Sequence, residues 1–451
     1  MVELVVLHGE VGELMARRYR LIGGWREPMG RWRVWLPVAG LSALLVVETF
    51  FDLRRSMTPS PWLWNSYLIV HLLAALACLV LILAGRDGNR FSRAGWIVIG
   101  FAAALMACSL VSAAVTPLPR VSYVTVPRAY LVVPTLTAAA TLLLGAAVVR
   151  VLPDQPVHRV LWWPAALTLA CAFAQWPRSA VVHGSPRLAT GMGGSAVVHV
   201  PLLLATGVAL AAFLAGWRRW WSLGLTVIGV AAVVLTGSRS GVVCLVLAGV
   251  VVGLQWLRSR RAWLVAGAAV VVTGIVVAAV PMLHRLFNPT DELRAQNLET
   301  AITFWAGTPK HILLGVGSGR LWPWYAFDSH LLRTPWRGMV TTSWGPALNS
   351  SHSTFLQVLV ELGLLGMVLL LPAVVVPVVV LARRLWPSIR AAARPVPDLI
   401  PLIALVATIP AFFLDAFLLK NYGASLWWWL VVLCCLRRPQ SAPSTSEQNL
   451  G

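Results

Sequence analysis

The chain has 451 residues, of which 58% are hydrophobic and only 12% are charged, and its formal net charge is +20. A soluble domain of ordinary composition carries about 25% charged residues, so one soluble core cannot hide this much apolar surface. The 36 Lys and Arg residues are scattered in short gaps between apolar runs. Because no basic face with interleaved aromatic residues is present, the positive charge does not indicate nucleic-acid binding.

Apolar stretches of about 20 residues recur along the whole chain and predict an all-α, polytopic transmembrane helical bundle. The run 220–257 is divided at "TGSRSG", because an Arg between Ser and Gly residues interrupts a hydrophobic helix. We expect about 12 spans, which lie roughly at 34–53, 66–85, 95–116, 130–150, 160–177, 195–216, 220–236, 240–257, 262–281, 353–382, 398–419 and 423–436.

The chain divides accordingly into five parts. We expect a cytoplasmic N-terminal segment (1–33), a first set of spans (34–281), a long external loop with short helices (282–352), a second set of spans (353–436) and a disordered cytoplasmic tail (437–451). Lys and Arg residues concentrate in the short loops on the side of the two termini. The positive-inside rule therefore predicts that both termini are cytoplasmic and that the loop 282–352 is external.

No signature of a soluble enzyme is present: the sequence contains no GxxxxGK[ST] loop, no GxGxxG motif and no HExxH motif. The six cysteines lie inside apolar runs, which indicates neither a disulfide framework nor a metal site. We therefore expect no metal and no cofactor.

Arg239 is the first candidate for chemistry, because it lies in "LTGSRSG" between two predicted spans. Thr236, Ser238 and Ser240 surround it with hydroxyl groups, and the neighbouring glycines let the backbone approach a ligand. Such a composition suits an oxyanion such as a phosphate. The alternative is an interfacial arginine in a tight turn whose side chain reaches the lipid head groups.

Arg294 is the second candidate and lies in a stretch, 291–306, whose apolar stripe predicts a helix along the membrane surface. The alternative is an exposed helix charge that pairs with Asp291 or Glu292. The segment "GVGSG" (315–319) that follows predicts a tight loop, for which phosphate binding is a weaker interpretation.

His352 is the third candidate, at the threshold between the long loop and a predicted span. An imidazole titrates near neutral pH and can act as a general base. Ser350, Ser351 or Ser353 can cap the following helix, whose free N–H groups would favour an anion beside the histidine. The alternative is an interfacial histidine with a capping role only.

Several acidic residues fall within predicted spans. Glu361 lies nine residues after His352, about 13 Å along an ideal helix, so it is too far away to share an atom-level site with that histidine. We expect structural or pairing roles for Glu361, for Glu48 and Asp52 in the first span, and for Asp415 with Lys420. A proton-coupled transporter would also use such residues.

Three elements in this order resemble the family of O-antigen ligases and O-antigen polymerases, which are bacterial membrane glycosyltransferases. They are "TGSRSG", "LRAQ…ITFWAGTPKHILLGVGSGR" and "HSTFLQVLVELGLLG", which together cover about 235–366. The stretch "PRLATGMGGSAVVHVPLLL" agrees loosely and contributes Arg187. Where Ser353 follows His352, the family usually has Asn, so this chain has a hydroxyl instead of an amide at that position.

The resemblance implies transfer of a glycan from a polyprenyl (undecaprenyl) diphosphate donor to an acceptor hydroxyl. This transfer is metal-independent, inverts the anomeric carbon and occurs at the outer face of the bacterial cytoplasmic membrane. It implies that Arg239, Arg294 and Arg187 bind the diphosphate and that His352 is catalytic. The partners would be the lipid-linked glycan, a glycan or lipid acceptor and membrane lipid.

Two alternatives remain open for the function. Within the same chemistry the protein could be a polysaccharide polymerase instead of a ligase. In another class it could be a secondary transporter or flippase, which would place charged residues near mid-membrane in paired, broken helices. Five tryptophans in the long loop, Trp305, Trp322, Trp324, Trp336 and Trp344, could either stack on sugar rings or form an aromatic belt at the membrane interface.

Overall fold

The structure is a computed structural model. It describes residues 31–51, 66–84, 91–121, 123–183, 187–254, 292–329, 331–332, 339–342, 345–390 and 396–438. The predicted ninth span, 262–281, and Asp52 lie outside these residues.

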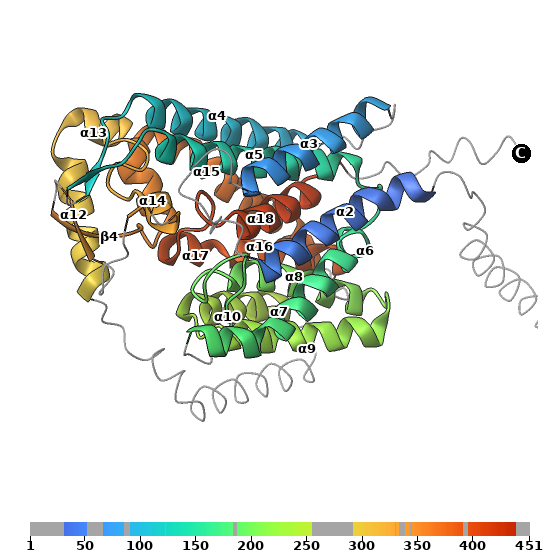
Figure 1. Cartoon of the computed structure of the whole chain (residues 1–451). Helices are drawn as coiled ribbons and strands as arrows, with labels where there is room; N and C mark the ends of the chain where they lie inside the picture. The colour runs from blue at the N-terminus through green and yellow to red at the C-terminus, as the bar shows by residue number, and fades with distance from the viewer. Residues whose placement is uncertain are drawn as a thin grey trace, which may run out of the picture.

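Long helices run side by side in a bundle, and short elements gather at one end of it (Figure 1). The bundle helices are α2 (Arg31–Phe50), α3 (Ser66–Ala84), α4 (Arg93–Val115), α5 (Ala129–Val151), α7 (Trp162–His183), α8 (His199–Leu214), α9 (Arg219–Leu235), α10 (Arg239–Leu254), α15 (Thr354–Arg390), α16 (Ile400–Ala407), α17 (Ile409–Leu414) and α18 (Tyr422–Cys435). The short α6 (Val157–Val160) precedes α7, and a 3-10 turn, η2 (Pro397–Leu399), precedes α16.

Every predicted span that falls within the described residues overlaps a helix, and the span 398–419 corresponds to the pair α16 and α17, which ends at Leu414. Four described segments are long and apolar enough to cross a membrane: Arg93–Val115, Ala129–Val151, Thr354–Pro387 and Pro397–Leu414. Helices α2, α3, α8, α9, α10 and α18 contain shorter apolar segments, whereas α7 belongs to neither group. A membrane helical protein is thus confirmed, whereas the 12 spans and their sidedness remain predictions.

Helix α18 is the centre of the bundle. All 14 of its residues are buried, including Trp427, Trp428 and Trp429. It packs against α5, α8 and α16, and no face is left for lipid. A helix that is apolar all round is stable in this position, because every side chain finds an apolar neighbour.

Threonines within α5 show how polar groups are accommodated in such a bundle. The hydroxyls of Thr135, Thr137 and Thr141 each donate to the backbone carbonyl four residues earlier, at 3.2, 2.8 and 2.9 Å. Satisfying a hydroxyl within its own helix avoids an unpaired polar group in an apolar surrounding.

We call the described part of 292–348 the cap. It contains α12 (Glu292–Ala306), α13 (Pro309–Leu314), α14 (Trp324–Asp328), β3 (Met339–Thr342) and β4 (Gly345–Leu348). β3 and β4 form an antiparallel hairpin, and β1 (Arg120–Val121) and β2 (Val124–Thr125) from the α4–α5 connection complete a small sheet in the order β2-β1-β3-β4. The cap therefore also contacts the first half of the chain.

Three details of the prediction were wrong. The chain is not purely α-helical, because it contains strands of two and four residues. These strands are too short to show an alternating pattern in the sequence. The tail does not begin at Arg437, whose guanidinium donates to Pro153 O (3.0 Å) and Val149 O (2.8 Å). The span 353–382 is in fact a longer helix, α15, with a break at Gly363 (φ 67°, ψ −163°).

Candidate functional site

A cleft of about 590 Å³ opens where the cap meets the bundle. Its polar lining consists of Arg294, Ser351, His352 and Ser353. The remaining wall is apolar and includes Leu359, Met367 and Leu371 of α15 and Phe413 of α17. Since these α15 residues follow one another along the helix away from His352, the cleft suits a molecule with a polar group and a long apolar part.

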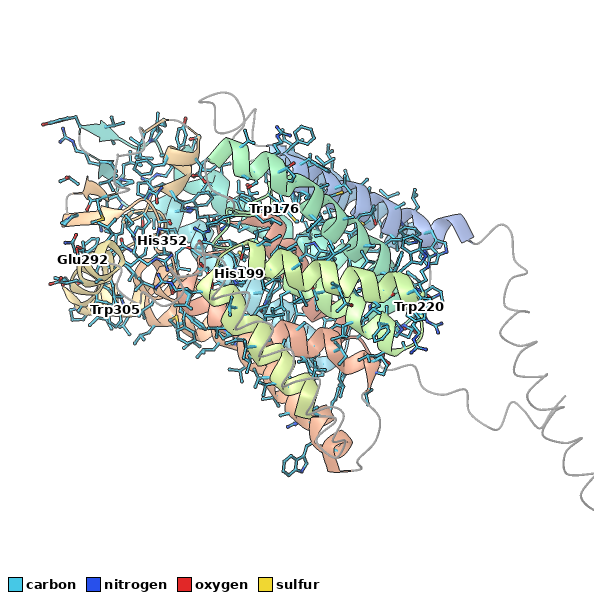
Figure 2. The ribbon with its side chains drawn as sticks, turned by 90° about the horizontal axis from the view of Figure 1, so that it is seen from below. Trp176, His199, Trp220, Glu292, Trp305 and His352 are labelled. Atoms are coloured by element: carbon cyan, nitrogen blue, oxygen red, sulfur yellow. The ribbon has the colours of Figure 1, made fainter. Side chains whose placement is uncertain are left out.

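His352 lies in this cleft with an unusual backbone. Its φ is +52°, in the left-handed region that few residues other than glycine adopt. Holding a side chain there costs on the order of 1–3 kcal/mol, and such strain is often found at functional positions. Figure 2 shows His352 between the cap, marked by Glu292 and Trp305, and the bundle residue His199.

Ser353 caps the helix that follows His352. Its Oγ accepts from Leu356 N at 3.1 Å and lies 3.1 Å from Phe412 O, to which it donates. The predicted serine cap is therefore confirmed at this residue. Ser is a favourable N-cap residue, as Asn is, so Ser353 is sufficient for this cap.

Arg294 reaches from α12 across the cleft to the end of α17. Its Nη1 donates to Leu414 O at 3.3 Å. The expected helix is confirmed, and its arginine is directed to the bundle. Asp291, one of the two partners considered for it, lies outside the described residues.

Arg239 is the first residue of α10, so a helix boundary lies within "TGSRSG" as predicted. Its side chain is partly buried. Its two neighbours are hydrogen-bonded to each other, with 2.8 Å between Ser238 Oγ and Ser240 Oγ. Ser240 Oγ donates to Asp415 Oδ2 at 2.5 Å, and His199 Nε2 lies 3.9 Å from the same oxygen. The start of α10 is thus fixed to the loop between α17 and α18.

Arg187 lies beside this turn. Its Nε donates to Thr236 O at 2.9 Å and its Nη2 to Gly237 O at 3.4 Å. Gly237 has a φ of 59°, and a Cβ at that position would lie 3.2 Å from Arg187 Nε. A glycine is therefore needed here, both for the backbone conformation and for the arginine that packs on it.

Asp415 connects the segments that carry the three predicted residues. Its side chain accepts from Ser240, next to Arg239. Its backbone carbonyl accepts from Thr354 N (3.1 Å) and Thr354 Oγ1 (2.9 Å), two residues after His352. The preceding carbonyl, Leu414 O, accepts from Arg294. The structure therefore brings the segments of Arg239, Arg294 and His352 together around one loop, with Arg187 adjacent.

The electrostatics of Asp415 follow from this position. It lies just after α17, and burial raises the pKa of its carboxyl from 3.8 to about 7. The hydrogen bond from Ser240 and the charges of Arg294 and Arg187 act in the opposite direction and favour the carboxylate. A group that titrates near neutral pH next to two arginines is typical of a functional site.

The sequence interpretation did not single out His199, and it gave Asp415 a structural or pairing role or a role in a proton-coupled transporter. His199 is fully buried in the first turn of α8, and the close approach of Gly241 leaves room for it. Each residue is isolated in the sequence. The sequence shows each of them only as an ionisable side chain within an apolar run. That pattern does not indicate that His199 and Asp415 lie close to each other.

Glu361 lies outside the cleft, as expected. It is fully buried in a smaller cavity of about 30 Å³, where Gln357 Nε2 donates to it at 3.3 Å. The loop "GVGSG" packs there against the broken part of α15: Val316 N donates to Val360 O (2.8 Å) and Gly317 N to Glu361 O (3.1 Å). Its glycines therefore serve close packing, and the phosphate-binding interpretation is not needed.

The described tryptophans of the cap are not exposed platforms. Trp322 is completely buried and Trp324 is 5% exposed, while Trp305 is partly buried. Trp322 and Trp324 are therefore core residues, and both the sugar-stacking and the aromatic-belt interpretations are wrong for them. Trp336 and Trp344 lie outside the described residues.

An apolar helical bundle, with a cleft at one end that has a polar and an apolar lining, is the architecture of a membrane helical protein. Residues 224–371, about a third of the chain, match the family model described as O-antigen ligase, and this match supports the resemblance to the O-antigen ligase family. The matched range contains Arg239, Arg294 and His352. A comparison with curated proteins found no match.

The family match over this third of the chain and the apolar helices support a bacterial inner-membrane protein similar to the ligase- or polymerase-type glycosyltransferases. Lipid-linked glycans are the substrates that this family implies.

Proposed function

We propose that the protein is an O-antigen ligase-like glycosyltransferase that moves a glycan from a polyprenyl diphosphate to an acceptor hydroxyl at the outer face of the membrane. The observation that carries the proposal is the cleft, in which Arg294 and His352 share one lining that continues into an apolar wall along α15. A diphosphate fits the polar part, and a polyprenyl chain fits the wall.

The transfer is a single displacement. The bond between the anomeric carbon and the diphosphate oxygen breaks, and its electron pair leaves with the polyprenyl diphosphate. The acceptor oxygen bonds to the anomeric carbon from the opposite face, which inverts its configuration. His352 takes the hydroxyl proton as a general base.

The arginines stabilise the leaving group. Negative charge grows on the diphosphate as its bond breaks, and guanidinium groups present paired N–H donors to phosphate oxygens. Arg294, in the cleft lining, and Arg239 and Arg187, on the adjacent turn outside that lining, supply this charge, and no metal is needed. The loop at Asp415 keeps the arginine-bearing segments and the start of α15 at a fixed separation.

The glycans of a strain that lacks the gene distinguish the two activities within this class. Full-length glycans that stay on the lipid carrier indicate a ligase, the function we favour. Short, unpolymerised glycans indicate a polymerase. Normal glycans, with full attachment, would contradict both.

A transporter or flippase is the second candidate, and one observation favours it. Helix α15 is broken at Gly363, two residues after the buried Glu361, and broken helices beside an acidic residue are typical of transporter ion sites. Two results would support it over the enzyme: movement of intact donor across vesicles by the purified protein, and loss of that movement in Glu361→Gln.

A further inference from the structure

Arginines and tryptophans gather at the end of the bundle opposite the cap, where α6 leads into α7 and α8 turns into α9. The expectation that no basic face carries interleaved aromatic residues is therefore wrong for this end of the bundle. Figure 2 shows Trp220 there, at the far side of the molecule from Glu292. We call the following residues the Arg–Trp surface: Arg159, Trp163, Arg218, Arg219, Trp220 and Trp221. None of them belongs to the cleft.

The arginines of this surface are held by aromatic rings. The guanidinium carbon of Arg218 lies 4.5 Å from the ring centre of Trp162 and 4.7 Å from that of Trp163. The carbon of Arg159 lies 4.9 Å from Trp217, and that of Arg219 lies 5.6 Å from Trp220. Each distance falls within the range of a cation–π interaction.

Stacking leaves the donors of these arginines available. A ring contacts the flat face of a guanidinium, whereas its N–H groups point outward in the plane. Neither Arg218 nor Arg219 hydrogen-bonds or ion-pairs with its side chain to any residue that the structure describes. The nearby acid, Asp398, interacts with His158 at 3.3 Å and is influenced by the charge of Arg159.

The surface is also held rigid. Trp162 Nε1 donates to Ser222 Oγ at 2.9 Å, and Ser222 Oγ donates to Trp217 O at 2.8 Å. These bonds tie the start of α7 to the turn before α9. Arg218 itself has a φ of 47° in the left-handed region, so its direction is set by this turn at a cost in backbone strain.

Two large aromatic side chains project beside these cations. Trp220 and Trp221 are each 76% exposed. Tryptophan concentrates at the level of the lipid head groups, where its ring is buried in the interface and its N–H stays hydrated. A site for a free anion would have no use for two exposed indoles, whereas a lipid offers both a phosphate and an interface.

We propose that the Arg–Trp surface binds the phosphate head groups of anionic phospholipids. The N–H edges of Arg218 and Arg219 contact the phosphate oxygens, while Trp220 and Trp221 insert between neighbouring head groups. This surface is a lipid site separate from the cleft, at the opposite end of the bundle.

Native mass spectrometry of the purified full chain tests the proposal, with phosphatidylglycerol and phosphatidylcholine titrated in parallel. We expect phosphatidylglycerol to bind more tightly. The double variant Arg218→Gln/Arg219→Gln should weaken it roughly 30-fold, because each arginine near a lipid surface contributes a factor of about five. Inorganic phosphate should not displace the lipid.

The matched control is Arg93→Gln/Arg383→Gln, which removes the same charge from exposed positions on α4 and α15. Its affinity for phosphatidylglycerol should stay within about threefold of the wild type, since charges outside the surface act only through screened potentials. An equal loss in both double variants, no loss in the first, or displacement by inorganic phosphate would each overturn the proposal. The Tm of each variant checks that the fold is intact.

Discussion

The two ends of the bundle hold their arginines in different ways. At the cap end, Arg187 and Arg294 donate to backbone carbonyls of neighbouring segments, Thr236 O and Leu414 O, and of these two arginines Arg294 lines the cleft. At the far end, Arg218 and Arg219 stack on indole rings. Hydrogen bonds to carbonyls fix the position of a guanidinium and of the segment that carries the carbonyl. A reaction requires charged groups at such fixed positions. Ring contacts fix only a plane, which is enough for a fluid lipid surface.

The largest effect should come from the base at the cleft. His352→Ala removes the group that accepts the hydroxyl proton, and we expect the transfer rate to fall by about 10²–10⁴. The rate is measured with purified protein and lipid-linked donor. Arg218→Ala, at the far end, is the control and should transfer at the wild-type rate. A near-normal rate in His352→Ala would remove the base assignment.

Exchanging arginine for lysine at both ends sharpens the comparison. Lysine keeps the charge but lacks the planar fork that matches two phosphate oxygens. Arg239→Lys and Arg294→Lys should therefore weaken donor binding about 10- to 100-fold, the effect of losing one charge-assisted hydrogen bond. Arg218→Lys should leave it unchanged. Donor affinity is measured by equilibrium binding. If Arg239→Lys and Arg294→Lys bind the donor as tightly as Arg218→Lys does, the diphosphate site is contradicted.

Asn297 tests whether the cap positions the cleft residues. Its Oδ1 accepts from Trp322 Nε1 and from Leu348 N, both at 2.9 Å. Asn297 lies about one helical turn after Arg294 on α12, and Leu348 lies four residues before His352. Asn297→Leu leaves both donors unpaired, with an expected loss of about 1–3 kcal/mol in stability. Its kcat should also fall, because Arg294 and His352 lose their common support.

Asn297→Asp keeps the accepting oxygen and is the matched variant. It should restore most of the kcat that Asn297→Leu loses. If both variants show the same kcat, or if Asn297→Leu lowers only the Tm, the cap does not position the cleft.

The smallest effect concerns pH. Because the pKa of Asp415 is raised from 3.8 to about 7 by burial, the folded state binds more protons than the unfolded state between these values. Stability contributed by this group is therefore present at low pH and falls as the pH rises through the window. Asp415→Asn should remove that part of the pH dependence. The Tm of the wild type and of Asp415→Asn is measured between pH 4 and 8. If the Tm of both proteins changes with pH in the same way, this prediction is contradicted.

Local signals explain what the sequence predicts well. A helix in an apolar surrounding needs only its own hydropathy, so α3, α4 and α5 begin and end close to their predicted bounds. Arg239 and His352 were predicted because each lies in a polar motif beside an apolar run. The serine cap is likewise a local feature, since Ser353 bonds to a residue three positions later.

Tertiary contacts explain what the sequence did not predict. Asp415 is hydrogen-bonded to Ser240 and Thr354 and is influenced by the charges of Arg294 and Arg187. All four residues are far from it in the sequence. Trp322 is buried by the cap around it, which no pattern within the loop indicated.

The central claim is that the cleft carries out transfer, and a product analysis tests it most directly. Purified protein in vesicles is supplied with a polyprenyl diphosphate-linked glycan and an acceptor, and both lipid products are measured by mass spectrometry. We predict one free polyprenyl diphosphate for each glycan transferred, and neither product with His352→Ala. Intact donor that crosses the vesicle membrane without cleavage would contradict the account.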